Sequence, residues 1–160
     1  MLQSEIEEIR RLAKNLHPPL LDLGINTAIT SFIEEFGLTH EDIIIRDDIH
    51  IPENSIPEFL KIAIFRVLQE ALNNVAKHSR AGAIKITLLN KEDLIQMTIQ
   101  DDGQGFTQGG RDGYALPDDG FGIPSMKERV QLSGGDFHLE SHLGKGTTIT
   151  ATWPVSVVTP

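Results

Sequence analysis

The sequence predicts an α+β fold in which a layer of helices covers a mixed sheet. Two observations support this prediction. Apolar residues recur at helical spacing in three or four segments, and four or five short apolar segments have the composition of strands. The length of 160 residues is about that of one domain, and a hydrophobic content of 39% suits a packed core.

The N-terminal part contains two predicted helices that are separated by prolines. Apolar residues form a stripe over residues 4–16, and its abrupt start predicts that the chain was cut from a longer protein. Pro18 and Pro19 end this helix, because proline lacks a backbone donor and clashes with the preceding turn. A second, short helix is predicted over residues 20–36, with Gly37 as its end.

The central part alternates between short strands and one long helix. A short apolar strand is predicted at residues 43–45, and the longest helix at 57–77. Ser55 and Glu58 have the spacing of a capping box, and Pro57 suits the first helical turn. The buried face of this helix is expected to start at Phe59. Strands at 83–89 and 94–100 flank a polar turn, which predicts a hairpin.

The C-terminal part begins with a glycine-rich loop over residues 106–119. A loop of this length inside a compact domain is a functional lid or a disordered segment. A helix over 123–132 follows and ends at Gly134-Gly135, and two strands at 137–141 and 147–153 complete the domain. Trp153, in the last strand, is predicted to lie in the core, and residues 156–160 form a tail.

Charge and composition exclude several classes of function. The net charge of −9 argues against non-specific nucleic-acid binding, which depends on Lys and Arg. The absence of Cys excludes disulfides and thiolate metal sites, and the chain has no apolar run long enough to span a membrane. The N-terminus lacks the pattern of a signal peptide, so we expect a cytoplasmic domain.

The long helix carries three polar residues that are suited to binding a metal ion or phosphate. Glu70 and Asn74 are four residues apart and so share one face, and Lys77 follows one turn later. An Asn oxygen is a suitable ligand for Mg²⁺, and a Lys side chain neutralises phosphate. The alternative is a solvated polar stripe opposite the buried face.

Three acid or glycine motifs follow in order. Asp101-Asp102-Gly103-Gln104-Gly105 comes directly after a strand, so a carboxylate there can accept a hydrogen bond from a base while the glycines permit close approach. Gly120-Phe121-Gly122 opens a helix whose N-terminus suits phosphate. Gly144-Lys145-Gly146-Thr147 leads into the last strand. Each motif alone is compatible with an ordinary turn.

Together the motifs resemble the ATP-binding catalytic domain of a bacterial sensor histidine kinase, within the Bergerat-type ATPase superfamily. The segment QEALNNVAKH resembles the N box, DDGQGF the first glycine box, GFGIPSMKERV the second, and GKGTTITATWP the closing strand. The resemblance covers about residues 55–155. The residues Gln-Glu-Ala-Leu and Met-Lys-Glu-Arg-Val resemble those of the subgroup whose kinases work with helix-turn-helix response regulators. The implied fold is a two-layer α/β sandwich.

The resemblance implies a role for each matching position, with ATP and Mg²⁺ as cofactors. Glu70 is the implied catalytic residue, and Asn74 the Mg²⁺ ligand. Asp101 is implied to bind the adenine amino group. The other implied nucleotide-binding residues are Lys77, His78, Gly103, Gly105, Gly120, Gly122, Met126 and Thr147.

The N-terminal part resembles the end of a dimerisation helix. This divides the chain into 1–24, the end of that helix, 25–155, the ATP-binding catalytic domain, and 156–160, the tail. His17 is not expected to accept phosphate, because two prolines follow it and break the helix that an acceptor needs. The implied partners are the phosphoacceptor dimerisation domain of the full-length kinase and a response regulator, without direct contact to nucleic acid or membrane.

Three other functions stay open on the same fold. An anti-sigma-type serine/threonine kinase would not be expected to carry a dimerisation helix. An interaction module without ATP binding would not need Glu70, Asn74, Asp101 and the glycines together. An ATP-hydrolysing machine would be expected to be larger.

Overall fold

The computed structural model describes residues 18–106 and 122–155. The predicted helix over 4–16, His17, Gly120 and the tail over 156–160 lie outside these residues, as does nearly all of the predicted loop over 106–119. Among the described residues, no helix has both the length and the apolar character to cross a bilayer.

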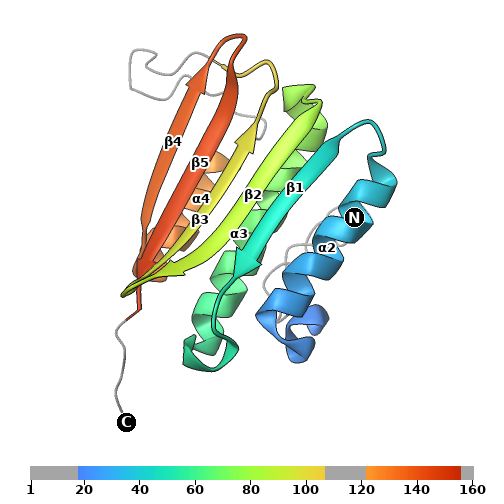
Figure 1. Cartoon of the computed structure of the whole chain (residues 1–160). Coiled ribbons are helices and arrows are strands. Elements are labelled where there is room, and N and C mark those ends of the chain that lie inside the picture. The colour runs from blue at the N-terminus through green and yellow to red at the C-terminus, as the bar shows by residue number, and fades with distance from the viewer. Residues whose placement is uncertain (1–17, 107–121, 156–160) are drawn as a thin grey trace, which may run out of the picture.

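The described residues form one five-stranded mixed sheet (Figure 1). The strands are β1 (Ile44–His50), β2 (Ala83–Lys91), β3 (Leu94–Asp101), β4 (Asp136–His142) and β5 (Gly146–Pro154), and their order is β1-β2-β3-β5-β4. β1 pairs with β2 in parallel, whereas the other three pairs are antiparallel. The predicted α+β fold with a mixed sheet is therefore confirmed.

Three α-helices lie on one side of the sheet (Figure 1). They are α2 (Ile25–Thr39), α3 (Glu58–Asn74) and α4 (Ile123–Leu132). α3 contacts both other helices, and α2 and α4 contact the edge strands β1 and β4. The core fills the space between the two layers, where alternate residues of β2 and β3 are buried, as the period of a strand requires.

The segment before the sheet differs from the single helix predicted over 20–36. A 3-10 helix, Pro19–Leu23, comes first, and Gly24 separates it from α2 with a φ of 99°. The Glu53 carboxylate accepts hydrogen bonds from the backbone N–H groups of Ile25 (2.9 Å) and Asn26 (2.8 Å). This cap satisfies donors at the α2 N-terminus. Gly37 does not end α2, which continues to Thr39.

The long helix also differs at both ends from the prediction. Pro57 is the N-cap residue of α3, whereas the predicted capping box requires Ser55 at that position. Phe59 is 60% exposed, and the buried face begins instead at Leu60. At the other end, the α-helix stops at Asn74 and a π-helix, Val75–Ser79, replaces its last turn.

The C-terminal half follows the prediction closely. The hairpin of β2 and β3 is confirmed, with strands that extend to Lys91 and Asp101. α4 has the predicted bounds, and Gly134 follows it with a φ of 90°. Trp153 is fully buried, and its indole Nε1–H donates to Ser133 Oγ at 2.9 Å, which joins β5 to the end of α4.

Candidate functional site

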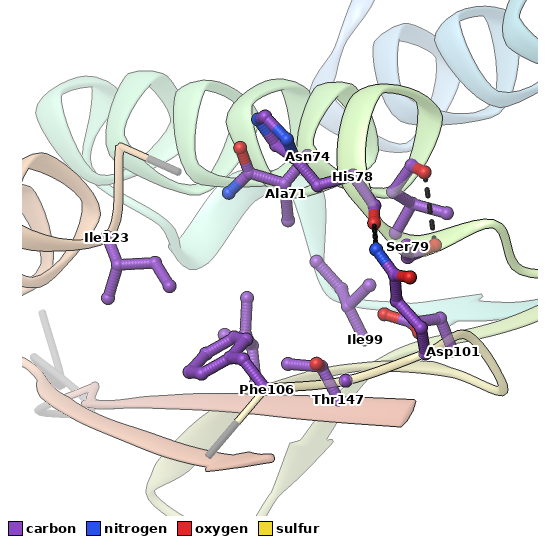
Figure 2. A pocket seen from close by; sticks show the side chains of 13 residues that line it. Ala71, Asn74, His78, Ser79, Ile99, Asp101, Phe106, Ile123 and Thr147 are labelled. Carbon is purple, nitrogen blue, oxygen red and sulfur yellow. Dashed lines mark hydrogen bonds between the residues drawn. The ribbon is translucent and has the colours of Figure 1, made fainter. Parts of the chain in front are cut away.

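The candidate site is a pocket where the C-terminal end of α3 lies over the ends of β3 and β5. It opens to solvent and holds about 500 Å³ of empty space. In Figure 2, the side chains of Asn74 and His78 lie along the helix, while Phe106 and Thr147 lie below them and Asp101 lies to one side. The lining residues are Ala71, Asn74, Val75, His78, Ser79, Ile99, Asp101, Gln104, Gly105, Phe106, Ile123, Thr147 and Ile149.

Asp101 is the buried carboxylate of this pocket. It ends β3 and is only 7% exposed, because strand alternation places it on the same face as Ile99. The backbone N–H of Gly103 donates to Asp101 Oδ1 at 2.9 Å, and the backbone N–H of Thr147 also donates to the carboxylate. Burial raises the pKa of Asp101, and these two hydrogen bonds offset part of that rise.

Two glycine turns bring backbone close to Asp101. A Cβ at Gly103 would overlap the carbonyl oxygen of Ser79 and approach Asp101 Oδ1 at 2.8 Å. A Cβ at Gly146, which has a φ of 82°, would overlap the carbonyl oxygen of Asp101. Both positions therefore require glycine for space, and Gly146 requires it for conformation as well. Asp102, in contrast, is exposed and accepts from the backbone of Gly82 and Ala83 at 2.8 and 2.9 Å.

The π-helix shapes the opposite wall. Its Ser79 hydroxyl donates to the carbonyl of Val75 at 3.0 Å, and the Gln104 side chain donates to the carbonyl of His78. Figure 2 shows these contacts as dashed lines. Gln104 thus connects the first glycine motif to the helix end. Asn74 and His78 line the pocket, whereas Lys77 is exposed and does not.

Thr147 is held by a neighbour that the sequence did not indicate. It lies opposite Asp101 in the β3–β5 register. The Ser141 hydroxyl, on β4, is 2.8 Å from Thr147 Oγ1 and accepts a hydrogen bond from the backbone N–H of Phe106 at 2.9 Å. Ser141 is 1% exposed, so it fixes the start of the loop against the sheet. Ser141 belongs to none of the motifs, so no sequence pattern indicated this role.

The remaining walls of the pocket are apolar. Ile99 on β3 and Ile149 on β5 line the pocket from the sheet, and Ile123 lines it from α4. Phe106 lies between Ile123 and Thr147 in Figure 2. An apolar slot with one buried hydrogen-bonding group at its end suits a flat, partly polar ring such as a nucleobase. The predicted residue Gly105 also lines this pocket, with a φ of 61°.

A second cavity lies beside the pocket, between α3 and α4. It is more polar and is lined by Arg66, Gln69, Glu70, Asn73, Ser125, Met126 and Arg129. Glu70 lies here and not in the first pocket. A Cβ at Gly122 would overlap Glu70 Oε1, so the carboxylate contacts the α4 N-terminus, where the helix dipole favours negative charge.

Met126 lines the second cavity and not the first pocket. It is 2% exposed, packs in the core and lines the second cavity, while Ile123 is the α4 residue in the first pocket. The structure therefore brings Asn74, His78, Asp101, Gly105 and Thr147 together in one pocket. Gly103 supports it, Glu70, Met126 and Gly122 lie toward α4, and Lys77 lies on the surface.

The available donors are compatible with Mg²⁺ only if a ligand contributes. Within the described ranges, no group of three or more His, Cys, Asp or Glu residues could hold a metal. Mg²⁺ is bound in nucleotide sites by one or two protein oxygens, substrate phosphates and water. The Asn74 side chain lines the pocket and offers one amide oxygen, which fits that pattern.

Curated relatives of the chain are sensor kinases. It is 33% identical over 145 residues to the signal transduction histidine-protein kinase/phosphatase UhpB of Salmonella typhimurium. This alignment covers 90% of the chain and 28% of the relative. It is 31% identical over 158 residues to DegS of Brevibacillus brevis, and this alignment covers 98% of the chain and 39% of the relative. The chain thus spans less than half the length of these relatives.

Solved structures give the same fold. The histidine kinase domain of the Erythrobacter litoralis EL346 blue-light activated histidine kinase superposes with a TM-score of 0.69 at 17% identity. The superposition covers 83% of this chain and 62% of that domain. The names of these relatives and structures confirm the resemblance to the ATP-binding domain of a sensor histidine kinase.

The family model for histidine kinase-, DNA gyrase B- and HSP90-like ATPases matches residues 60–157. This match includes nearly all of α3 and the whole of β2, β3, α4, β4 and β5, so it contains every residue that lines the pocket. The chain therefore belongs to the histidine kinase-, DNA gyrase B- and HSP90-like ATPase family.

Proposed function

We propose that this domain binds Mg²⁺-ATP in the pocket around Asp101 and donates the γ-phosphate to a histidine on a separate dimerisation helix. The observation that carries the proposal is the buried Asp101 carboxylate at the end of an otherwise apolar slot, with Asn74 on the facing helix. The adenine ring would occupy the slot. Its amino group would donate to Asp101, with the Thr147 hydroxyl beside it.

The phosphates would extend from the slot past Asn74. There the Asn74 amide oxygen would be a ligand of Mg²⁺, which neutralises phosphate charge when bound. His78 would contact the nucleotide from the same wall. Glu70, one helical turn before Asn74, would polarise the attacking group as the phosphate transfers. In phosphoryl transfer the protein contributes mainly positioning and charge stabilisation, which this arrangement of side chains suits.

Lys77 has the weakest support among the proposed nucleotide contacts. Its side chain is exposed and outside the pocket lining. A contact with phosphate would require the long side chain to bend back over the helix end. Its substitution is therefore expected to reduce ATP affinity less than substitution of Asn74.

The proposed partners follow from the same reaction. The acceptor would be the phosphoacceptor dimerisation domain of the full-length kinase, and the phosphate would pass on to a response regulator. Both relatives reported above are named as histidine-protein kinases and phosphatases in signal transduction, which supports this assignment. An anti-sigma-type serine/threonine kinase or an ATPase on the same fold is the second candidate, and the product of the reaction separates them.

The binding proposal is tested by calorimetry with Mg²⁺-ATP. Asn74→Ala should weaken Mg²⁺-ATP binding about tenfold or more, because it removes an oxygen ligand of the ion. Asp101→Asn keeps one oxygen for Gly103 and replaces the other with an amide donor, so it should also weaken binding. Asn90→Ala and Asp93→Asn, on the exposed β2–β3 hairpin, are matched controls. Unchanged affinity in both site variants would refute the assignment.

The phosphotransfer proposal is tested with ATP labelled at the γ-phosphate and a purified dimerisation domain. Label that is lost in acid and retained in alkali indicates phosphohistidine and supports the proposal. Acid-stable label indicates a serine or threonine product and favours the second candidate. Release of inorganic phosphate without labelled protein indicates an ATPase.

A further inference from the structure

Two arginines face each other across the cleft between α3 and α4. Arg66 is on α3 and Arg129 is on α4, and both line the polar cavity beside the nucleotide pocket. The cavity opens to solvent and holds about 950 Å³ of empty space. None of the motifs in the sequence includes Arg66, and the proposed function gives no role to either arginine.

The two positive charges are close enough to oppose each other. Burial lowers the pKa of Arg66, and the charge of Arg129 lowers it further. Within the described ranges, Arg129 forms no ion pair with Glu70 or with any other carboxylate. The two guanidinium groups share one cavity, and they create a local positive potential there. This local potential exists although the chain carries a net charge of −9.

We propose that Arg66 and Arg129 bind the terminal phosphate of the nucleotide, so that the domain distinguishes a triphosphate from a diphosphate. This inference rests on the proposed function, because it requires the base to lie at Asp101. The ligand class is a nucleoside triphosphate, and the recognised group is its outermost phosphate. Arginine suits this role because its planar fork can donate two parallel hydrogen bonds to phosphate oxygens.

The position of the cavity supports this assignment. Along α3, Asn74 lines the nucleotide pocket, whereas Glu70 and Asn73 line the arginine cavity. Along α4, the residue in the nucleotide pocket is Ile123, and residues from Ser125 to Arg129 line the arginine cavity. A phosphate chain that left the slot past Asn74 toward Glu70 would enter the arginine cavity.

The helical rise gives the scale of this path. Glu70 lies about 6 Å along the axis from Asn74, and Arg66 about 12 Å, at 1.5 Å per residue. The terminal phosphate would thus lie near Glu70, and the long arginine side chains would reach it from α3 and α4. Their charge would also offset the repulsion between the Glu70 carboxylate and the phosphate. Ser125, in the first turn of α4, adds a hydroxyl to the same cavity.

The test compares the affinities of Mg²⁺-ATP and Mg²⁺-ADP for four proteins. These are the wild-type chain, Arg66→Gln, Arg129→Gln and the control Arg46→Gln, which removes an exposed charge on β1. Each cavity variant should lose about tenfold or more in ATP affinity and at most about twofold in ADP affinity. The control should retain both affinities. Retained ADP binding also shows that each variant is folded.

Three results would overturn the inference. Equal losses for ATP and ADP would mean that the arginines maintain the shape of the whole site. Unchanged ATP affinity would mean that they do not contact the nucleotide. If the wild-type chain binds neither nucleotide, the proposed function fails together with this inference, whereas the first two results leave the proposed function intact. Arg66→Lys adds a further arm, because it keeps the charge but loses the fork, and intermediate ATP affinity is expected.

Discussion

Two glycines of the last motif should differ sharply in their tolerance of alanine. Gly144 and Gly146 both have positive φ, 79° and 82°, so a side chain at either position is strained. Around Gly144 a Cβ would meet nothing within 4 Å, whereas at Gly146 it would overlap the carbonyl oxygen of Asp101. The pair therefore separates conformational strain from steric conflict at the site.

The expected costs follow from these surroundings. Alanine at Gly144 should cost about 1–2 kcal/mol of unfolding free energy, the strain of a left-handed conformation. Alanine at Gly146 should cost about 1–3 kcal/mol more, because β5 must move away from β3. For a domain of this size, a difference of about 2 kcal/mol corresponds to about 6 °C in Tm.

The assay is thermal unfolding, followed by ATP binding at a temperature where both variants are folded. Gly146→Ala should also weaken ATP binding, since a shift of β5 moves the Thr147 N–H that donates to Asp101. Gly144→Ala should bind as the wild type does. Equal loss of stability in the two variants, or equal ATP affinity, would refute the reasoning that close backbone approach at Gly146 shapes the pocket.

Three further predictions concern single side chains. Asp101→Ala should lower the unfolding free energy by about 2–4 kcal/mol, because it leaves two N–H groups without their acceptor. Asp101→Asn should lower it by about 1 kcal/mol, and thermal unfolding at pH 7 measures both losses. Glu53→Gln should lower the free energy by about 1 kcal/mol through a weaker helix cap, while Glu34→Gln, on the exposed face of α2, should have no measurable effect. Trp153→Phe should cost about 2–3 kcal/mol in urea unfolding, because it leaves a void in the core and removes the hydrogen bond to Ser133. A loss below about 0.5 kcal/mol for any of these variants except Glu34→Gln and Asp101→Asn would contradict the contact on which its prediction rests.

The contributions of Glu53 and Asp101 to the stability of the domain should depend on pH in opposite directions. Burial raises the pKa of Glu53, but hydrogen bonds from Asn26 and Ile25 outweigh it, so the net pKa is lowered. Its cap is therefore fully effective above the ordinary value of 4.5 and is lost as the pH falls through the lower folded pKa. The raised pKa of Asp101 gives the reverse: stability falls as the pH rises from 3.8 through the folded pKa. Tm profiles of Glu53→Gln and Asp101→Asn against the wild type check both signs.

Much of the sheet, and the burial of Asp101 at its end, was predictable from the sequence. Strand alternation from Ile95 through Ile99 places Asp101, and not Asp102, on the buried face. The acid-glycine motif then follows at the strand end, where only a turn can form. These signals are local, and local patterns are what a single sequence carries most reliably.

The helix end and the second cavity were not predictable in the same way. The α-helix changes to a π-helix after Asn74, and Gln104 donates to the His78 carbonyl of that π-helix from a distant turn. Because a π-helix has more residues per turn, Lys77 rotates away from the face of Asn74 while His78 stays near it. The facing of Arg66 and Arg129 depends on how α3 packs against α4. Arg129 lies in the segment GFGIPSMKERV, but Arg66 lies in no motif, so no sequence pattern pairs the two residues.

Backbone contacts fix one half of the candidate site, whereas side chains around an open cavity form the other half. Substitutions in the two halves should therefore differ in their effects on stability and on nucleotide binding. At the adenine end, Asp101 is fixed by the backbone of β5 and of the turn at Gly103, so changes there should alter stability and nucleotide binding together. At the phosphate end, the proposed contacts are side chains of α3 and α4 around an open cavity. Changes at Arg66 and Arg129 should therefore alter the preference for ATP over ADP with little loss of stability. A preference that changed only when Tm also fell would show that the phosphate end is instead part of the packed structure.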